Sequence, residues 1–224
     1  MKKRLIILAL SLTTVFVISS CQQTDIVGKT SITSFNEVLN KIPNNVVADE
    51  MNKGWSLNAP DGSARFIWSK DFSTSPLHDV MLEFDSKPFI DAGLDVSKLP
   101  AGMAYGDKIM VGTKLGKEKL SYTGEVTPLA SYEQIVKLKR LSIKYHTALD
   151  HYGVDLADGN MFEWAKDMNT NDKDIVYVLN PKVFIDAGVD PQKVAGWVFA
   201  KVPIIDKDGK SVEVDKFLKP FDLK

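Results

Sequence analysis

FIDAGLD at residues 89–95 decides the fold, because it returns as FIDAGVD at residues 184–190, 95 positions further along the chain. Five consecutive identities, a conservative Leu-to-Val exchange and a sixth identity are too many for coincidence in a chain of 224 residues. Self-similarity at a fixed offset is typical of a duplicated structural unit. The sequence therefore predicts a mature chain built from two homologous modules.

The repeat extends on both sides of this stretch, with an offset that drifts by only three residues. The matched segments are SFNEV at 34–38 with SYEQI at 131–135, DG at 61–62 with DG at 158–159, WSKD at 68–71 with WAKD at 164–167, VMLEFD at 80–85 with IVYVLN at 175–180, and AGMAY at 101–105 with AGWVF at 195–199. Short insertions in loops explain such a drift. We assign residues 31–127 to the first module and residues 128–224 to the second.

Each module is predicted to follow an α-β-β-α-β-β order, which indicates an α+β fold with mainly antiparallel sheet. Apolar residues at helical spacing predict helices at 31–42, with Ser34 as its N-cap, and at 131–152. The predicted strands are 55–58, 65–69, 80–84, 103–111, 119–123, 160–166, 175–179, 197–205 and 211–214, with Pro203 marking an edge or bulge. Residues 217–224 are predicted as a tail that docks on the body. Two such modules would pair about a pseudo-twofold axis, through joined sheets or packed helices.

The repeated stretch has a structural interpretation. Its Phe and Ile residues would pin a short helix to the sheet, its Gly would take a left-handed conformation, and its last Asp would cap the next turn. These residues are Phe89 and Phe184, Ile90 and Ile185, Gly93 and Gly188, and Asp95 and Asp190. In the functional alternative, Asp91 and Asp186 would face each other, and two close carboxylates suit acid–base chemistry or a cation.

The N-terminus has the features of an export signal. Residues 2–4 are basic, residues 5–18 form an apolar run too short for a membrane span, and ISSC follows at 18–21. This segment resembles the signal peptide of bacterial lipoproteins, in which the cysteine is lipidated and becomes the first mature residue. The resemblance covers this segment alone. It implies a signal peptide at 1–20, a palmitate-bearing lipid attached to Cys21, and a lipidated tether at 21–30.

Cys21 is the only cysteine of the chain, which excludes an intrachain disulfide. Lipidation would also consume the thiol and exclude it from catalysis. The alternative is an ordinary secretory signal with an incidental cysteine. A lipidated chain would be anchored extracytoplasmically, on the cell membrane or the outer membrane. Gln22 favours the outer membrane in a Gram-negative cell, because an inner-membrane retention signal tends to place Asp there.

Composition excludes some functions. The formal net charge is −1, with 25% charged and 44% hydrophobic residues, which is ordinary globular composition. Near-neutral charge gives no argument for nucleic acid, and we expect no nucleic-acid partner. Gly-rich phosphate loops, GxSxG elbows and HExxH helices do not occur in the sequence. We therefore assign no catalytic residue and no cofactor.

Other candidate residues are weaker. Trp68 and Trp164 are equivalent and predict core packing, whereas Trp55 and Trp197 have no tryptophan counterpart and are better candidates for a ligand groove. On a helix, His146 and His151 would not share a face, because they are five residues apart. With His78 as the remaining histidine, we assign no metal site. The acidic loops at 167–171 and 206–209 lack the Gly and Glu positions of a calcium loop and are interpreted as solvated turns.

These observations predict a lipid-anchored cell-envelope protein, most simply a non-catalytic binding or assembly module. Its partner would be an envelope protein or a small-molecule ligand, in addition to the membrane that holds Cys21. The alternative is an envelope hydrolase with a carboxylate site at the interface between the modules. A third possibility is a structural lipoprotein that binds only another envelope protein.

Overall fold

The computed structural model describes residues 29–75, 77–138, 140–147, 149–168, 173–206 and 208–223. The predicted signal peptide, Cys21 and most of the tether lie outside this part of the chain, as do residues 169–171 of the first acidic loop. Within the described residues, we find no helix of the length and hydropathy that a membrane span requires.

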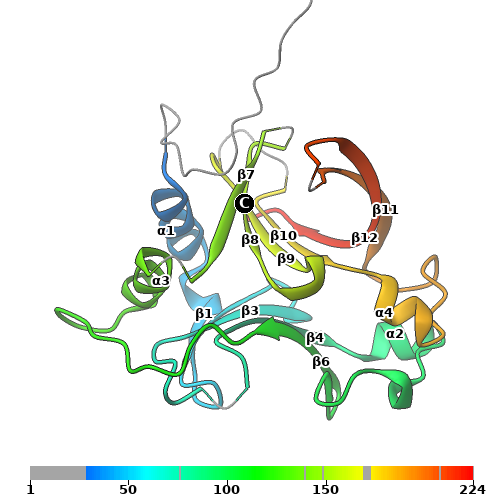
Figure 1. Cartoon of the computed structure of the whole chain (residues 1–224), viewed down its shortest axis with the longest axis horizontal. Coiled ribbons are helices and arrows are strands. Elements are labelled where there is room, and N and C mark those ends of the chain that lie inside the picture. Colours follow the sequence, from blue (N-terminus) through cyan, green and yellow to red (C-terminus); the bar gives the residue numbers. More distant parts are fainter. Residues whose placement is uncertain are drawn as a thin grey trace, which may run out of the picture.

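Two six-stranded antiparallel sheets form the body of the molecule (Figure 1). The first has the order β1-β2-β3-β4-β6-β5, with β1 (Val46–Asp49), β2 (Gly54–Asn58), β3 (Ala64–Ser69), β4 (Val80–Asp85), β5 (Ala104–Tyr105) and β6 (Lys108–Thr113). The second has the order β7-β8-β9-β10-β12-β11, with β7 (Ser142–His146), β8 (His151–Asp155), β9 (Met161–Ala165), β10 (Ile175–Leu179), β11 (Val198–Ile205) and β12 (Ser211–Phe221). The two halves of the chain thus build sheets of the same strand order.

Each half begins with a longer helix and carries a short one before its last hairpin. The longer helices are α1 (Ser31–Lys41) and α3 (Pro128–Lys137), and the short helices are α2 (Lys87–Asp91) and α4 (Lys182–Asp186). Three 3₁₀ turns are also described: η1 (Pro43–Asn45), η2 (Val96–Lys98) and η3 (Ala157–Gly159). Thr30, not Ser34, is the N-cap of α1, because its side chain accepts a hydrogen bond from Thr33 N. Four strands separate the helices of each half, so the α-β-β-α-β-β prediction omits strands.

The helix predicted at 131–152 is wrong beyond its first part. It ends at Lys137, and a β-hairpin of β7 and β8 follows. Ile143 and Tyr145 in β7, and Tyr152 and Val154 in β8, alternate with more polar residues, which is the period of a strand. The same apolar positions also fit helical spacing, and this ambiguity misled the prediction.

The C-terminal segment is also different from the prediction. Residues 217–221 are no tail but the inner part of β12, which lies between β10 and β11. β11 is an edge strand, as Pro203 indicated. Residues 103–111 form the β5–β6 hairpin rather than one strand, and residues 119–123 form no strand.

Aromatic rings fill the space between the two sheets. Ring centroids of Phe35 and Tyr132 lie 4.1 Å apart. Those of Phe66 and Phe162 lie 4.5 Å apart with nearly parallel planes, and those of Phe89 and Phe184 lie 4.9 Å apart. Each pair joins a residue to its counterpart in the repeat. Such pairs contribute about 0.5–1.5 kcal/mol each beyond their buried area.

The longer helices are exchanged between the halves. α1 packs against β9 of the second sheet, whereas α3 packs against β2 and β3 of the first. Trp68 Nε1 donates to Ser131 Oγ at 2.9 Å, and Trp164 Nε1 donates to Ser34 Oγ at 2.9 Å. Each helix therefore supplies the hydrogen-bond acceptor for the buried tryptophan of the other half.

The short helices meet through their backbones. Asp95 N donates to Ala187 O at 2.9 Å, and Asp190 N donates to Ala92 O at 2.8 Å. Gly93 and Gly188 have φ of 104° and 105°, which confirms the predicted left-handed conformation. A Cβ at either glycine would lie 2.9 Å from the carbonyl oxygen of the other. Glycine is thus required here for φ and for close approach.

We predict unequal effects of removing the two serine acceptors. Ser34→Ala leaves the buried indole N–H of Trp164 without this acceptor and is expected to lower the free energy of unfolding by about 1–3 kcal/mol. Ser131→Ala should cost less, because Trp68 Nε1 also donates to Pro128 O at 3.1 Å. Urea unfolding measures both, with the exposed Ser142→Ala as control. A larger cost for Ser131→Ala would contradict this interpretation.

Two glycine-to-alanine variants separate the stability cost of backbone strain from that of a steric clash. Gly62 has φ of 73° but nothing within 4 Å of a Cβ, so Gly62→Ala is expected to cost about 1–2 kcal/mol for strain alone. Gly93→Ala adds a clash with Gly188 O and should cost at least about 1 kcal/mol more. Thermal and urea unfolding of the two variants test this, and equal costs would refute the close approach.

Candidate functional site

The outer face of the second sheet carries a buried cluster of one glutamate and two histidines. The β7–β8 hairpin places His146 directly opposite His151. Glu163 lies on the neighbouring strand β9, opposite Gly153 of β8. Because Phe162 and Trp164 point into the core, the alternation of β9 turns Glu163 to the other face. Three adjacent strands thus bring these residues together.

The glutamate is the centre of this cluster. His146 Nδ1 lies 3.1 Å from Glu163 Oε1, and His151 Nδ1 lies 3.7 Å from Glu163 Oε2. Glu163 and His151 are buried, whereas His146 is partly exposed. Burial alone would raise the pKa of Glu163, but the hydrogen bond from His146 and the closeness of both imidazoles outweigh it and lower that pKa to about 2. Glu163 is therefore a carboxylate at neutral pH.

Gly153 makes room for this cluster. A Cβ at this position would lie 3.0 Å from Met161 Cε, 3.3 Å from Glu163 Cγ and 3.4 Å from His146 Cε1. These contacts are tight enough to force the neighbouring side chains to shift. A glycine in the middle of a strand is otherwise unfavourable. The need to leave space for the side chains of Glu163 and His146 explains the glycine at this position.

The cluster holds one carboxylate between two imidazole rings. Its histidines lie against different oxygens of one carboxylate. Within the described ranges, no three His, Cys, Asp or Glu side chains are arranged to hold a metal ion. Neither ring nitrogen of His151 has a hydrogen-bond partner at normal distance, and its Nδ1 lies 3.7 Å from Glu163 Oε2. The cluster is thus a buried carboxylate between two imidazoles on a sheet.

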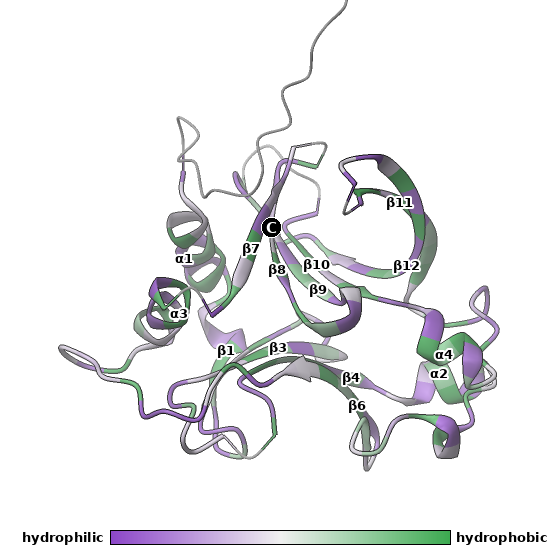
Figure 2. Cartoon of the chain, viewed as in Figure 1, coloured by the Kyte–Doolittle hydropathy of each residue, from purple (hydrophilic) through white to green (hydrophobic). Residues whose placement is uncertain are grey.

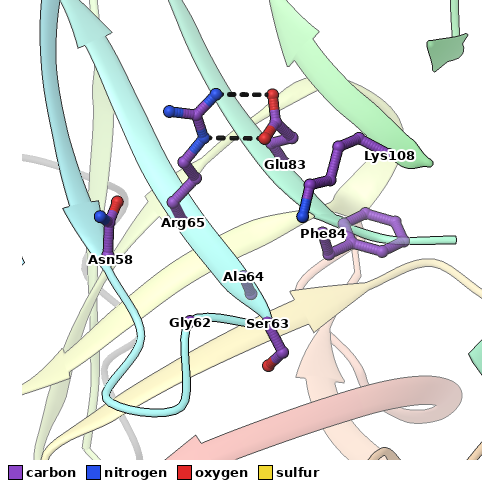
Figure 3. Close-up of a pocket in the computed structure, with 8 residues that line it drawn as sticks. All are labelled: Asn58, Gly62, Ser63, Ala64, Arg65, Glu83, Phe84 and Lys108. Carbon is purple, nitrogen blue, oxygen red and sulfur yellow. Dashed lines mark hydrogen bonds and ion pairs between the residues drawn. The ribbon is translucent and has the colours of Figure 1, made fainter. Parts of the chain in front are cut away.

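A pocket of about 210 Å³ lies on the first half, beside β3, β4 and β6 (Figure 3). Arg65 donates two hydrogen bonds to Glu83, at 2.8 and 2.9 Å, and lies 3.0 Å from Asp49. Lys108 pairs with Asp85. Each charged side chain that lines the pocket is therefore already paired. A charged ligand would have to displace one of these partners.

The two aspartates of the functional alternative each pair with a lysine of their own short helix. Asp91 pairs with Lys87 at 2.7 Å, and Asp186 pairs with Lys182 at 2.6 Å, each on its own short helix. Both carboxylates are more than half exposed. Neither contributes to the pocket on the first half.

The structure places the tryptophans against the core. Trp68 and Trp164 are fully buried, as predicted. Trp55 and Trp197 are partly buried and pack on the same core, with the Trp197 ring 5.4 Å from Phe84 and 5.6 Å from Phe89. These contacts favour a packing role over a ligand groove.

The remaining polar candidates have local roles. His78 lies in the loop before β4, where burial lowers its pKa. Asp206 Oδ1 accepts hydrogen bonds from Asp208 N and Lys210 N at the β11–β12 turn. Asp95 and Asp190 accept from Ser97 N and Gln192 N, which confirms the predicted caps.

Sequence reasoning missed the Glu163 cluster. It placed His146 and His151 on one helix, where a spacing of five residues separates them. In a hairpin the same spacing makes them directly opposite neighbours. The available signal was the two-residue alternation on either side of the turn.

Comparison with known proteins adds no relative: no family model, no curated protein and no solved structure matches this chain.

Loss of the buried carboxylate should give a pH-dependent loss of stability. Glu163 has a folded pKa of about 2 and an ordinary value of 4.5, so its contribution is present above 4.5 and is lost as pH falls toward 2. Glu163→Gln should lower the free energy of unfolding at about pH 5.5 by up to about 3 kcal/mol, and the difference should shrink on acidification. Urea unfolding across this range measures it.

Glu213→Gln, at an exposed position of β12, is the matched control and should show no such difference. A cost of Glu163→Gln that stays constant between about pH 5.5 and pH 2.5 would contradict the assigned charge state.

Proposed function

We propose that this chain is a lipid-anchored protein of the bacterial cell envelope that acts as a non-catalytic binding or assembly module. The anchor would be Cys21, on the outer side of the cell membrane or the outer membrane. The observation that favours this role over the hydrolase alternative is the seam between the halves, which aromatic rings rather than converging carboxylates fill. Partners would therefore bind to the outer surfaces of the sheets or to the short helices.

We further propose that the halves are two copies of one ancestral module related by a pseudo-twofold axis. In a twofold interface, a contact from residue i to residue j is matched by one from j to i, and residues on the axis meet their own copies. The exchanged Trp–Ser hydrogen bonds and the paired amides of Asp95 and Asp190 support the first feature. The ring pairs and the contact of Gly93 with Gly188 support the second.

The hydrolase alternative has less support. It needs two carboxylates that converge in a cleft between the modules. Asp91 and Asp186 instead carry lysine partners at an exposed end, and the seam itself is apolar. The paired charges around the pocket likewise favour an envelope protein over a small charged ligand as the partner.

The anchor would keep the folded body close to the bilayer. The chain from Cys21 to Lys29 has an extended reach of about 30 Å. A partner in the same membrane would therefore meet this protein at high effective concentration. This geometry suits an assembly role at the envelope surface.

We predict that Cys21→Ala releases the protein from the membrane, because the lipid is its proposed attachment. Fractionation of cells that express the full chain should move it to the soluble extracytoplasmic fraction and abolish labelling with palmitate. Gln22→Ala is the matched control and should keep both. Retention of Cys21→Ala in membranes would refute lipid anchoring.

A further inference from the structure

The end of the molecule formed by α2 and α4 presents the repeated stretch twice. The two short helices lie side by side (Figure 1), held by the paired amides of Asp95 and Asp190. Both helices carry strongly polar and strongly apolar residues (Figure 2). We call the surface formed by Lys87, Ile90, Asp91, Lys182, Ile185 and Asp186 the helix-pair face.

Most residues of the repeated stretch have an explanation within the fold. Phe89 and Phe184 are fully buried, and the alanines at 92 and 187 are nearly so. Gly93 and Gly188 allow the close backbone approach. The exception is the isoleucine pair.

The isoleucines were predicted to pin their helices to the sheet, and this is wrong. Ile90 is 46% exposed and Ile185 is 40% exposed. Each side chain is therefore only partly buried in this chain. Burial of the remaining apolar surface by a partner would be favourable.

The exposed apolar residues Val47 and Leu138 are not repeated in this way. Val47 is exposed, but its counterpart at the repeat offset is Lys144. Leu138 is exposed, and its counterpart is Lys41. At these positions the copies have diverged as surface positions do. The helix-pair face has kept its Lys, Ile and Asp in both copies.

The charges of this face complement themselves. Lys87 and Asp91 form one ion pair, Lys182 and Asp186 the other, and each pair flanks an exposed isoleucine. The face thus carries two exposed isoleucines and equal numbers of lysines and aspartates. A second copy turned against it can place each lysine near an aspartate, and like charges need not meet.

We propose that the helix-pair face is a self-association surface whose occupant is a second copy of this chain. The exposed apolar area is small, so the complex in solution is weak, with a dissociation constant of roughly 10 μM to 1 mM. Confinement to one membrane, which rests on the proposed anchor, raises the effective concentration of the copies. The self-association itself does not depend on the anchor.

Sedimentation of the mature chain carrying Cys21→Ser tests this surface. Its weight-average mass should rise toward that of a dimer as concentration approaches about 1 mM. Ile90→Asp with Ile185→Asp should weaken association at least about tenfold, because charges replace the two exposed isoleucines. The matched control is Ile204→Asp with Ile205→Asp, two exposed isoleucines of β11, which should associate like the parent.

A charge exchange makes the test specific. The variant Lys87→Glu with Lys182→Glu has an acidic face, and Asp91→Lys with Asp186→Lys has a basic one. Each alone should remain monomeric, and their equimolar mixture should form a one-to-one dimer. All four positions are exposed, so folding is not at stake.

Three outcomes would overturn the proposal. The first is a parent chain that stays monomeric at the highest concentration. The second is a loss of association in the β11 control, and the third is a failure of the acidic and basic variants to pair with each other.

Discussion

The structure depends on the mutual burial of two aromatic sheet faces. The inner face of each sheet is covered by the other half of the chain. The helix that begins each half packs on the sheet of the other half. Phe66 stacks on Phe162 at the centre, and each buried tryptophan reaches a serine from the opposite half. A single half would expose these rings to water and lose the acceptor for its indole. The two halves therefore stabilise each other and fold as one body.

This arrangement leaves the outer faces free to diverge. Arg65 and Glu83 form an ion pair on the first sheet, where their counterparts on the second are Met161 and Val178. Conversely, Glu163 on the second sheet corresponds to Ile67, which belongs to an apolar cluster on the first. The inner faces carry aromatic residues at matching positions of the repeat because they pack on each other. The outer faces differ between the two sheets because each packs only against its own neighbours.

The last hairpin shows the same freedom. β5 has two residues, whereas its counterpart β11 has eight and extends with β12 beyond the sheet. The hairpin register places Pro203 opposite Glu213 in a pair without mutual hydrogen bonds, so its missing N–H faces the free edge. Pro203 thus removes a hydrogen-bond donor from the edge strand β11, which makes pairing with a further strand less favourable.

The sequence by itself determined the internal repeat, the strands at 80–84 and 175–179, the left-handed glycines and the capping aspartates, because each depends on local pattern or on comparison of the two repeated segments. Only the tertiary structure decided that the helices are exchanged and that the isoleucines of the repeat face outward. It also decided that His146 and His151 meet at Glu163. The physical reason is that residues 142–155 satisfy helical and strand periodicity equally. Pairing of β8 with β9 resolves that ambiguity, and β9 lies beyond the turn that follows residue 155.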